Sequence, residues 1–124
     1  MACDHARVSK AAYFLDLAVV LLFAAAGRAS HELSDDVLGV LDTAWPFLVG
    51  MAIGWVVVAL LPGRVHSWWV DGLLVALCAL VVGMLGRQLT GEGTALPFVL
   101  VATGVLLAGL VGWRAVAAAV ARRA

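Results

Sequence analysis

The stretch TAWPFLVGMAIGWVVVALLPG, residues 43–63, contains no charged side chain and lies between Asp42 and Arg64. Its 21 residues can cross the hydrocarbon core of a bilayer, which needs about 20 residues of helix. A second uncharged interval, residues 93–113, has the same length. These two intervals predict two membrane-spanning helices.

Two further apolar stretches complete the pattern, and each is interrupted by a single aspartate, Asp16 or Asp71. Of all residues, 65% are apolar and 13% are charged, against roughly 45–50% apolar in a soluble domain. Strands of a membrane barrel would alternate in polarity, and these segments do not. We therefore expect an all-α membrane protein with a transmembrane domain over residues 11–117, four helices near 11–29, 44–62, 68–87 and 95–114, a tail at 1–10 and a basic tail at 118–124.

The first apolar stretch has a second interpretation, as a cleaved signal peptide. A basic start, an apolar middle at residues 11–26 and small residues at 24–26 are the parts of such a peptide. Asp16 disfavours this interpretation, because a carboxylate is awkward within the apolar part. The internal repeat described below also needs this segment as a helix.

The basic residues predict the orientation of the helices. With the amino terminus in the cytoplasm, six of the eight basic residues lie inside and only Arg28 and Arg87 lie outside, which agrees with the positive-inside rule. The inner six are Arg7, Lys10, Arg64, Arg114, Arg122 and Arg123. We therefore expect a multi-pass protein of the inner (plasma) membrane with both termini cytoplasmic. The basic residues are too few and too scattered for a nucleic-acid surface, so the expected partner is the lipid bilayer.

A short phrase occurs twice, as TAWPF at residues 43–47 and as TALPF at residues 94–98. An aspartate and then a Gly-Arg pair precede each copy in the same order: Asp16 with Gly27-Arg28, and Asp71 with Gly86-Arg87. This order predicts a duplicated helical hairpin, with both hairpins entering the membrane from the same side as parallel repeats. The phrase has a simpler interpretation as a helix start, with Thr43 and Thr94 as N-caps and each proline in the first turn.

Motifs along most of the chain are those of one family of membrane proteins. They are Leu15-Asp16, Phe23-Ala24, Gly27-Arg28 with Ser30-His31, TAWPFL at 43–48, Gly54-Trp55, Gly83-Met84, Arg87, GEGTA at 91–95, Phe98-Val99 and Gly112-Trp113-Arg114-Ala115. On these residues the chain resembles the domain of unknown function family 3054, a group of small prokaryotic membrane proteins. The tract at 67–69 fits the family pattern less closely. The resemblance implies a four-helix membrane protein and brings no catalytic or binding residues.

Polar groups gather at the outer end of the expected bundle. Arg28 and Arg87 each end an odd-numbered helix there, and Thr43 and Thr94 each begin an even-numbered helix. Helix N-termini carry a partial positive charge, so together with two guanidinium groups they predict an outer vestibule that attracts a carboxylate or a phosphate. Alternatively, each arginine pairs with an acidic residue of its own loop.

His31 follows the outer end of the first helix and is a candidate outer ligand. It would need a second subunit to complete a metal or haem site, and otherwise it is a polar loop residue. His5 and His66 face the cytoplasm, and the two cysteines, Cys3 and Cys78, fall at different depths. No metal site, disulfide or cofactor is therefore expected.

The two aspartates within apolar stretches are candidates for a proton or cation site. An ionised carboxylate in hydrocarbon is costly unless it is paired, protonated or hydrated. Asp16 lies six residues after Lys10, roughly 9 Å along a helix. Pairing with Arg64 or capping of a neighbouring helix would satisfy it structurally. Asp71 follows two tryptophans and is expected at the membrane interface.

Small residues recur at four-residue spacing. Gly50 and Gly54 make such a step, and Ala108 and Gly112 make another. These steps allow close helix packing in lipid, either within one chain or between subunits. Four spans in a short chain leave little room for a wide pathway, so we expect a homodimer if transport occurs.

Phosphate-binding loops, HExxH zinc motifs and Ser/His/Asp sets are absent from the sequence, and we do not expect an enzyme. Two hypotheses remain. The first is a transporter or channel for a small solute or ion, in which Asp16 handles a proton or cation and the arginines form the vestibule. The second is a non-catalytic accessory or structural membrane protein that binds a partner through its outer loop, residues 31–42.

Overall fold

The computed structural model describes residues 2–30, 37–91, 93 and 96–123, apart from the side chains of 2–9, 28–30 and 65. These residues form four long helices and one short 3-10 helix: α1 (Ala2–Ser30), α2 (Val37–Leu60), η1 (Gly63–Val65), α3 (Trp68–Leu89) and α4 (Leu96–Arg123). The expectation of an all-α fold with four long helices is confirmed.

All four long helices are long and apolar enough to cross a membrane. Their outward faces carry large apolar side chains, among them Phe14, Leu22, Leu60, Leu85, Leu100 and Val116. Apolar surface of this extent is a liability in water, whereas lipid tails are as apolar as leucine. The architecture is that of a multi-pass membrane protein.

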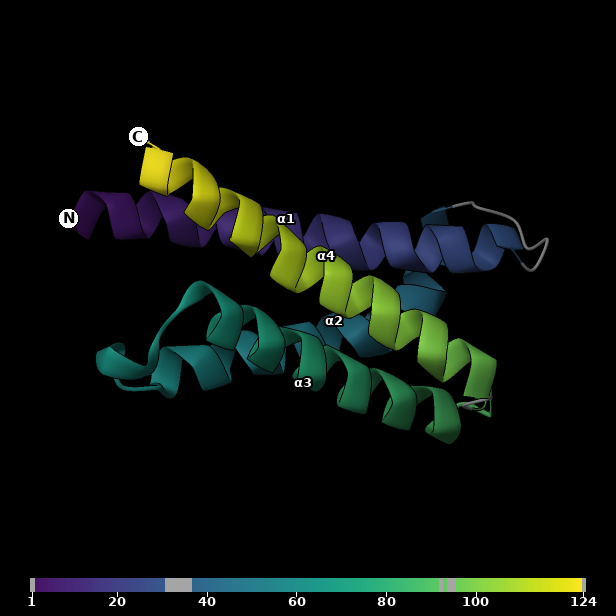
Figure 1. Cartoon of the computed structure of the whole chain (residues 1–124). Coiled ribbons are helices and arrows are strands. Elements are labelled where there is room, and N and C mark those ends of the chain that lie inside the picture. Colours follow the sequence, from purple (N-terminus) through teal and green to yellow (C-terminus); the bar gives the residue numbers. More distant parts are fainter. Residues whose placement is uncertain (1, 31–36, 92, 94–95, 124) are drawn as a thin grey trace.

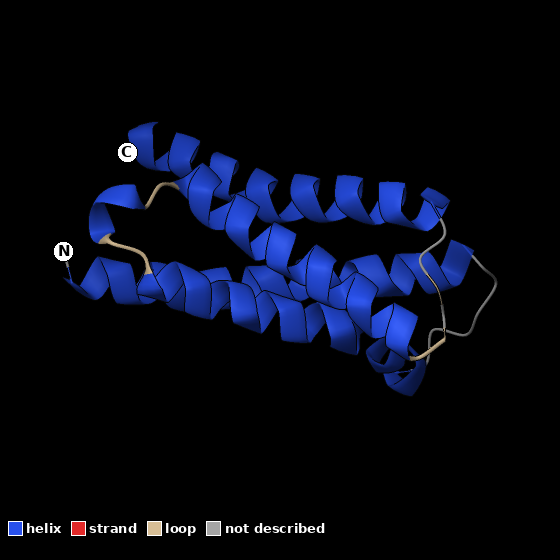
Figure 2. Cartoon of the chain, turned by 90° about the horizontal axis from the view of Figure 1, so that it is seen from below, coloured by secondary structure: helices blue, strands red, loops and turns tan. Residues whose placement is uncertain are grey.

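The helices run up and down in one bundle (Figures 1 and 2). α1 begins and α4 ends at one end, where η1 also connects α2 to α3; we call this the terminal end. α1 and α3 end at the opposite, distal end, where α2 and α4 begin. α2 and α3 share the most extensive contact, and α1 packs on α2 and α4 through smaller helix contacts.

The contact between α2 and α3 depends on two glycines. A Cβ atom built on Gly50 would lie 2.5 Å from the carbonyl oxygen of Cys78 and 2.7 Å from the Cα of Ala79. A Cβ atom on Gly54 would lie 2.8 Å from the Cα of Val75. Backbone packed directly on backbone leaves no room for a side chain, so the GxxxG step of α2 packs within one chain.

The small-residue step of α4 makes no close contact within the described part of the chain. Ala108 is exposed, and a Cβ atom on Gly112 would meet nothing within 4 Å. Packing of this step between subunits stays a prediction. Gly109 makes the close approach instead, because its Cβ would lie 2.5 Å from the Cγ1 of Val19 on α1.

The first copy of the repeated phrase lies inside a helix. α2 begins at Val37, so Thr43 and Pro46 are internal residues, and the interpretation of TAWPF as a helix start is wrong. Proline supplies no N–H to the helix, and its place here follows from packing: its ring lies against Gly86 of α3, where an added Cβ would come within 2.5 Å. In the second copy, Pro97 does lie in the first turn of α4, as expected.

Three aromatic rings fill the distal half of the core. Phe23, Phe47 and Phe98 come from α1, α2 and α4, and their ring centres are 5.2, 6.0 and 6.3 Å apart, within the range of favourable aromatic pairs. Gly83 of α3 leaves the space that the Phe47 ring occupies. Aliphatic side chains continue the core toward the terminal end, where it ends in a polar cluster.

Candidate functional site: a buried ion pair

The buried face of α1 ends in a carboxylate. Phe23, Val20 and Asp16 follow one another at spacings of three and four residues, which places them on one side of the helix. Asp16 has 0% of its surface exposed. A charge at this position needs a partner, since water is not there to solvate it.

Arg114 of α4 is that partner. The buried face of α4 passes through Leu106 and Leu110 in steps of four and reaches Arg114 at the next step, where the residue is 9% exposed. Its Nη1 and Nη2 atoms donate to Oδ1 and Oδ2 of Asp16, each at 2.8 Å. This two-pronged geometry is the strong form of an arginine–carboxylate contact. Nη1 also donates to the Leu110 carbonyl oxygen at 2.8 Å.

Two indole groups complete the surroundings of the carboxylate. Trp55 Nε1 donates to Oδ2 of Asp16 at 2.8 Å, and Trp113 Nε1 donates to Oδ1 at 2.9 Å. Each carboxylate oxygen therefore accepts two N–H groups. The guanidinium carbon of Arg114 also lies 4.6 Å from the centre of the Trp113 ring, a cation–π contact. Among the described residues, no buried side-chain nitrogen or oxygen lacks a hydrogen-bond partner.

All four long helices contribute to this cluster. Tyr13, one turn before Asp16 on α1, packs its ring 4.6 Å from the ring of Trp55 on α2. Gly72 of α3 allows the stem of Arg114 to lie along the α3 backbone, since a Cβ there would be 3.1 Å from the arginine Cδ. The ion pair is thus a point at which the four helices are held in register.

The identity of the partner corrects one expectation. Arg64 is exposed in η1, and Asp16 pairs with Arg114 instead. The physical reason is the length of α4, which continues to Arg123 and so places Arg114 within the bundle rather than at a membrane boundary. In this arrangement the carboxylate oxygens face four N–H groups, and a metal cation would have to displace the guanidinium.

Asp71 lies apart from this cluster. Its Oδ1 is 3.0 Å from Nδ1 of His66 at the terminal end. Ser67 caps α3 there by accepting a hydrogen bond from the Val70 N–H at 3.3 Å. Asp71 is partly exposed in the first turn of α3 and belongs to the polar start of that helix.

The predicted outer vestibule is described only in part. Arg87 is bound within its own hairpin: its Nε donates to the Gly93 carbonyl oxygen at 3.0 Å, and its guanidinium carbon lies 3.9 Å from the centre of the Phe98 ring. Thr43 is a half-buried residue inside α2. The remaining members, the side chain of Arg28 and Thr94, lie outside the described residues, and so does His31, the candidate outer ligand. The vestibule stays a prediction.

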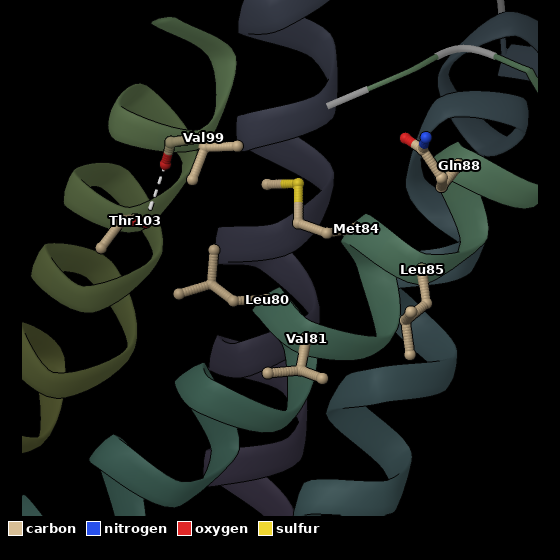
Figure 3. Close-up of a pocket in the computed structure, with 7 residues that line it drawn as sticks. All are labelled: Leu80, Val81, Met84, Leu85, Gln88, Val99 and Thr103. Carbon is tan, nitrogen blue, oxygen red and sulfur yellow. Dashed lines mark hydrogen bonds between the residues drawn. The ribbon is translucent and has the colours of Figure 1, made fainter. Parts of the chain in front are cut away.

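A groove of about 510 Å³ lies between α3 and α4 in the distal half of the bundle (Figure 3). Its lining is mostly aliphatic, with Gln88 and Thr103 as the polar members. The hydroxyl of Thr103 donates to the Val99 carbonyl oxygen at 2.7 Å, as the dashed line in Figure 3 marks. An open apolar groove of this kind suits lipid tails and does not reach the ion pair.

Trp55, Trp113 and Arg114 were not predicted as partners of Asp16. All three occur in the family motifs, but those motifs give no contacts. A stronger signal is spacing, because Arg114 follows the buried residues Leu106 and Leu110 of α4 at the same interval of four residues. Depth is a second signal: Asp16 lies six residues from Lys10, and Arg114 lies eight residues from Arg122.

Comparison with known proteins gives one match. Neither the curated proteins nor the solved structures provide a significant similarity to this chain. Residues 13–117 match the family described as Protein of unknown function (DUF3054). The matched region extends from Tyr13 to just beyond Arg114 and so includes the whole ion-pair cluster. The chain belongs to the DUF3054 family of proteins of unknown function.

Proposed function

We propose that this protein is a transporter of a small solute or ion, in which α1 moves against α4 while the Asp16–Arg114 pair opens and re-forms. The observation that carries the proposal is the pair itself, a buried carboxylate and guanidinium on two different membrane-spanning helices. Ionisable groups at such positions are costly, and in membrane proteins they commonly mark the path of a solute, ion or proton.

Packing divides the bundle into a firm part and a looser part. At the glycines of α2, the backbones of α2 and α3 approach so closely that an added Cβ atom would collide with α3. α1 touches α4 closely at Val19 and Gly109, with the ion pair on the terminal side of this contact and the Phe23–Phe98 contact on the distal side. A tilt of α1 about Val19 would separate the groups on one side and press them together on the other. Alternating access requires two arrangements of this kind.

The chemistry of the pair favours a proton over a metal cation as the ion that Asp16 handles. A proton on the carboxylate removes the charge that attracts Arg114 and weakens the link between α1 and α4. A metal cation would instead meet the positive guanidinium at close range, which is repulsive. Asp71, beside His66 at the terminal end, is the second candidate for a proton site.

We also propose that the protein lies in the inner (plasma) membrane with the terminal end in the cytoplasm. With Arg114 counted in the core, five basic residues remain at the terminal end, against Arg28 and Arg87 at the distal end. The positive-inside rule still favours cytoplasmic termini. The duplicated-hairpin origin remains a hypothesis. The two aspartates have different partners, so their contacts do not add support for it.

Thiol labelling tests the orientation. In a chain whose native cysteines are replaced, Leu38→Cys and Val120→Cys place single thiols at exposed positions near the two ends. A membrane-impermeant reagent added to whole cells is expected to label position 38 and to spare position 120. The opposite pattern would reverse the proposed orientation.

Flux in proteoliposomes tests transport. The wild-type protein is expected to move at least one ion or small metabolite under an imposed proton gradient, and Asp16→Asn, which keeps the shape but removes the charge, is expected to abolish that flux. Asp42→Asn is the matched control, because it removes an exposed carboxylate that lies outside the buried cluster and outside the second candidate proton site. The transport proposal fails if the wild-type protein moves nothing from a broad panel, or if Asp16→Asn moves as much as the wild type.

The complete hydrogen bonding of the cluster favours a second function, that of a non-catalytic accessory or structural membrane protein. In that case the pair only fixes the helices. A buried ion pair can often be replaced by apolar residues without loss of stability. The double variant Asp16→Leu with Arg114→Met separates the two functions: folded protein that has lost flux supports transport, and folded protein with every phenotype intact supports the structural role.

A further inference from the structure

We propose that the four N–H groups around Asp16 are a binding site for a small carboxylate anion, which enters when Asp16 is protonated and moves aside. In this structure the side chain of Asp16 occupies the site as an internal ligand. The claim that this anion is the transported substrate rests on the proposed function. The claim that the anion binds at this site can be tested without measuring transport.

The donor groups belong to helices other than α1. Trp55 lies on α2, and Trp113 and Arg114 lie on α4. The guanidinium is anchored within α4 by its hydrogen bond to the Leu110 carbonyl oxygen and by its contact with the Trp113 ring, and Gly72 of α3 borders its stem. The donors therefore keep their positions if Asp16 leaves, and they then form a preorganised receptor.

The arrangement of donors selects a carboxylate. Two oxygens each receive one guanidinium N–H and one indole N–H, at 2.8 to 2.9 Å. The arginine fork matches the two oxygens of a planar carboxylate. Chloride presents a single centre and cannot meet both pairs of donors at these distances. Phosphate carries more oxygens and more charge than the carboxylate that the cluster now holds.

Charge balance couples the binding of an anion to the protonation of Asp16. Among the residues whose side chains are described, Arg114 on α4 is the ionisable group that faces Asp16, while α2 presents Trp55 and α3 presents the backbone at Gly72 to the guanidinium. A proton on Asp16 leaves the guanidinium without its counter-charge. One carboxylate anion restores neutrality, so a proton and an anion move together with no net charge. The space that the Asp16 side chain vacates is that of a carboxymethyl group, which limits the anion to the size of formate or acetate.

Tryptophan fluorescence tests the binding claim on an otherwise native chain. Replacing Trp45, Trp68 and Trp69 by Phe leaves emission from the two indoles that bind the carboxylate. In acidic buffer, sodium formate and sodium acetate are expected to change this emission with saturation, while sodium chloride at equal ionic strength and the larger benzoate are not. Arg114→Gln should remove the response. A response that is absent, linear or equal with chloride would overturn the proposal.

A second variant tests the size of the site. Asp16→Ala vacates room for formate, and Asp16→Gly vacates room for acetate as well. Formate at about 100 mM is expected to raise the unfolding temperature of Asp16→Ala by roughly 5 °C relative to chloride, through binding to the folded state alone. Acetate should do so only for Asp16→Gly. Folded variants whose unfolding temperature is raised by neither anion would refute the assigned site. If the variants do not fold, the fluorescence titration tests the proposal.

Uptake measurements separate this proposal from the proposed function. Binding of formate or acetate without any flux of either would leave the carboxylate site in place and would remove transport as its purpose. If the protein moves a different solute and its indole fluorescence does not respond to formate or acetate, the transport proposal stands and the substrate assigned here is overturned.

Discussion

The two members of the ion pair should be energetically coupled, so that loss of both costs less unfolding free energy than the sum of the two single losses. Asp16→Asn keeps the shape of the side chain, but its NH2 group faces two N–H donors and Arg114 is left without a counter-charge. Breaking a buried ion pair in this way costs about 3–5 kcal/mol of unfolding free energy. Arg114→Gln is expected to cost a similar amount, because the carboxylate keeps only its two indole donors.

The double variant Asp16→Asn with Arg114→Gln contains no unpaired charge. We expect its loss of stability to be smaller than the sum of the two single losses by about 2–3 kcal/mol, the coupling found between groups in direct contact. Reversible unfolding in mixed micelles of rising SDS fraction, followed by circular dichroism, measures all three variants.

Asp71→Asn is the matched control, since that carboxylate is partly exposed and pairs with His66 outside the buried cluster. Its loss should stay below about 1 kcal/mol, as for surface ion pairs. Single losses no larger than that of the control, or single losses that add to give the double variant within about 0.5 kcal/mol, would refute the assignment of the pair as a coupled, buried unit.

Three further changes can be measured in the same unfolding assay. Gly50→Ala should cost about 1–3 kcal/mol because its Cβ meets the α3 backbone, whereas Gly104→Ala, where a Cβ meets nothing within 4 Å, should gain up to about 1 kcal/mol from helix propensity; equal effects would contradict the packing. Arg87→Lys should cost about 1–2 kcal/mol because lysine cannot reproduce both the hydrogen bond to a carbonyl and the stacking on an aromatic ring, and an unchanged stability would argue against both contacts. Phe23→Ala removes a ring from the aromatic cluster and should cost about 3–5 kcal/mol; a loss near zero would mean that this ring faces lipid.

The number of helices could be predicted because lipid imposes one dominant requirement, a sufficiently long apolar segment. The uncharged intervals at 43–63 and 93–113 meet it without ambiguity. Helix ends could not be predicted equally well. α2 begins at Val37 and α4 continues to Arg123, because the flanking residues are themselves good helix formers or apolar, and charge marks a membrane boundary rather than the end of a helix.

Of the residues that form the candidate site, only Asp16 was predicted from the sequence. The carboxylate of Asp16 can be recognised from the sequence because an ionised group inside an apolar segment has a high free-energy cost. Arg114 cannot be recognised as its partner in this way, because it directly follows an uncharged interval, where a basic residue normally marks the membrane boundary. The arrangement of helices, which decides that α1 meets α4 and that Trp55 lies beside them, depends on contacts such as that of Val19 with Gly109, and no periodicity encodes such contacts.

The ion pair joins two residues that are 98 positions apart in the chain, one on the first helix and one on the last. During synthesis the ribosome delivers α1 to the translocon long before it makes α4, so the carboxylate waits in the membrane without a counter-charge. A lone Asp or Arg at the centre of a helix raises the cost of insertion by about 2.5–3.5 kcal/mol, which the leucines and valines around it must offset. Formation of the pair is therefore a closing event of biogenesis. A nascent chain that stops before α4 therefore retains a carboxylate without its counter-charge.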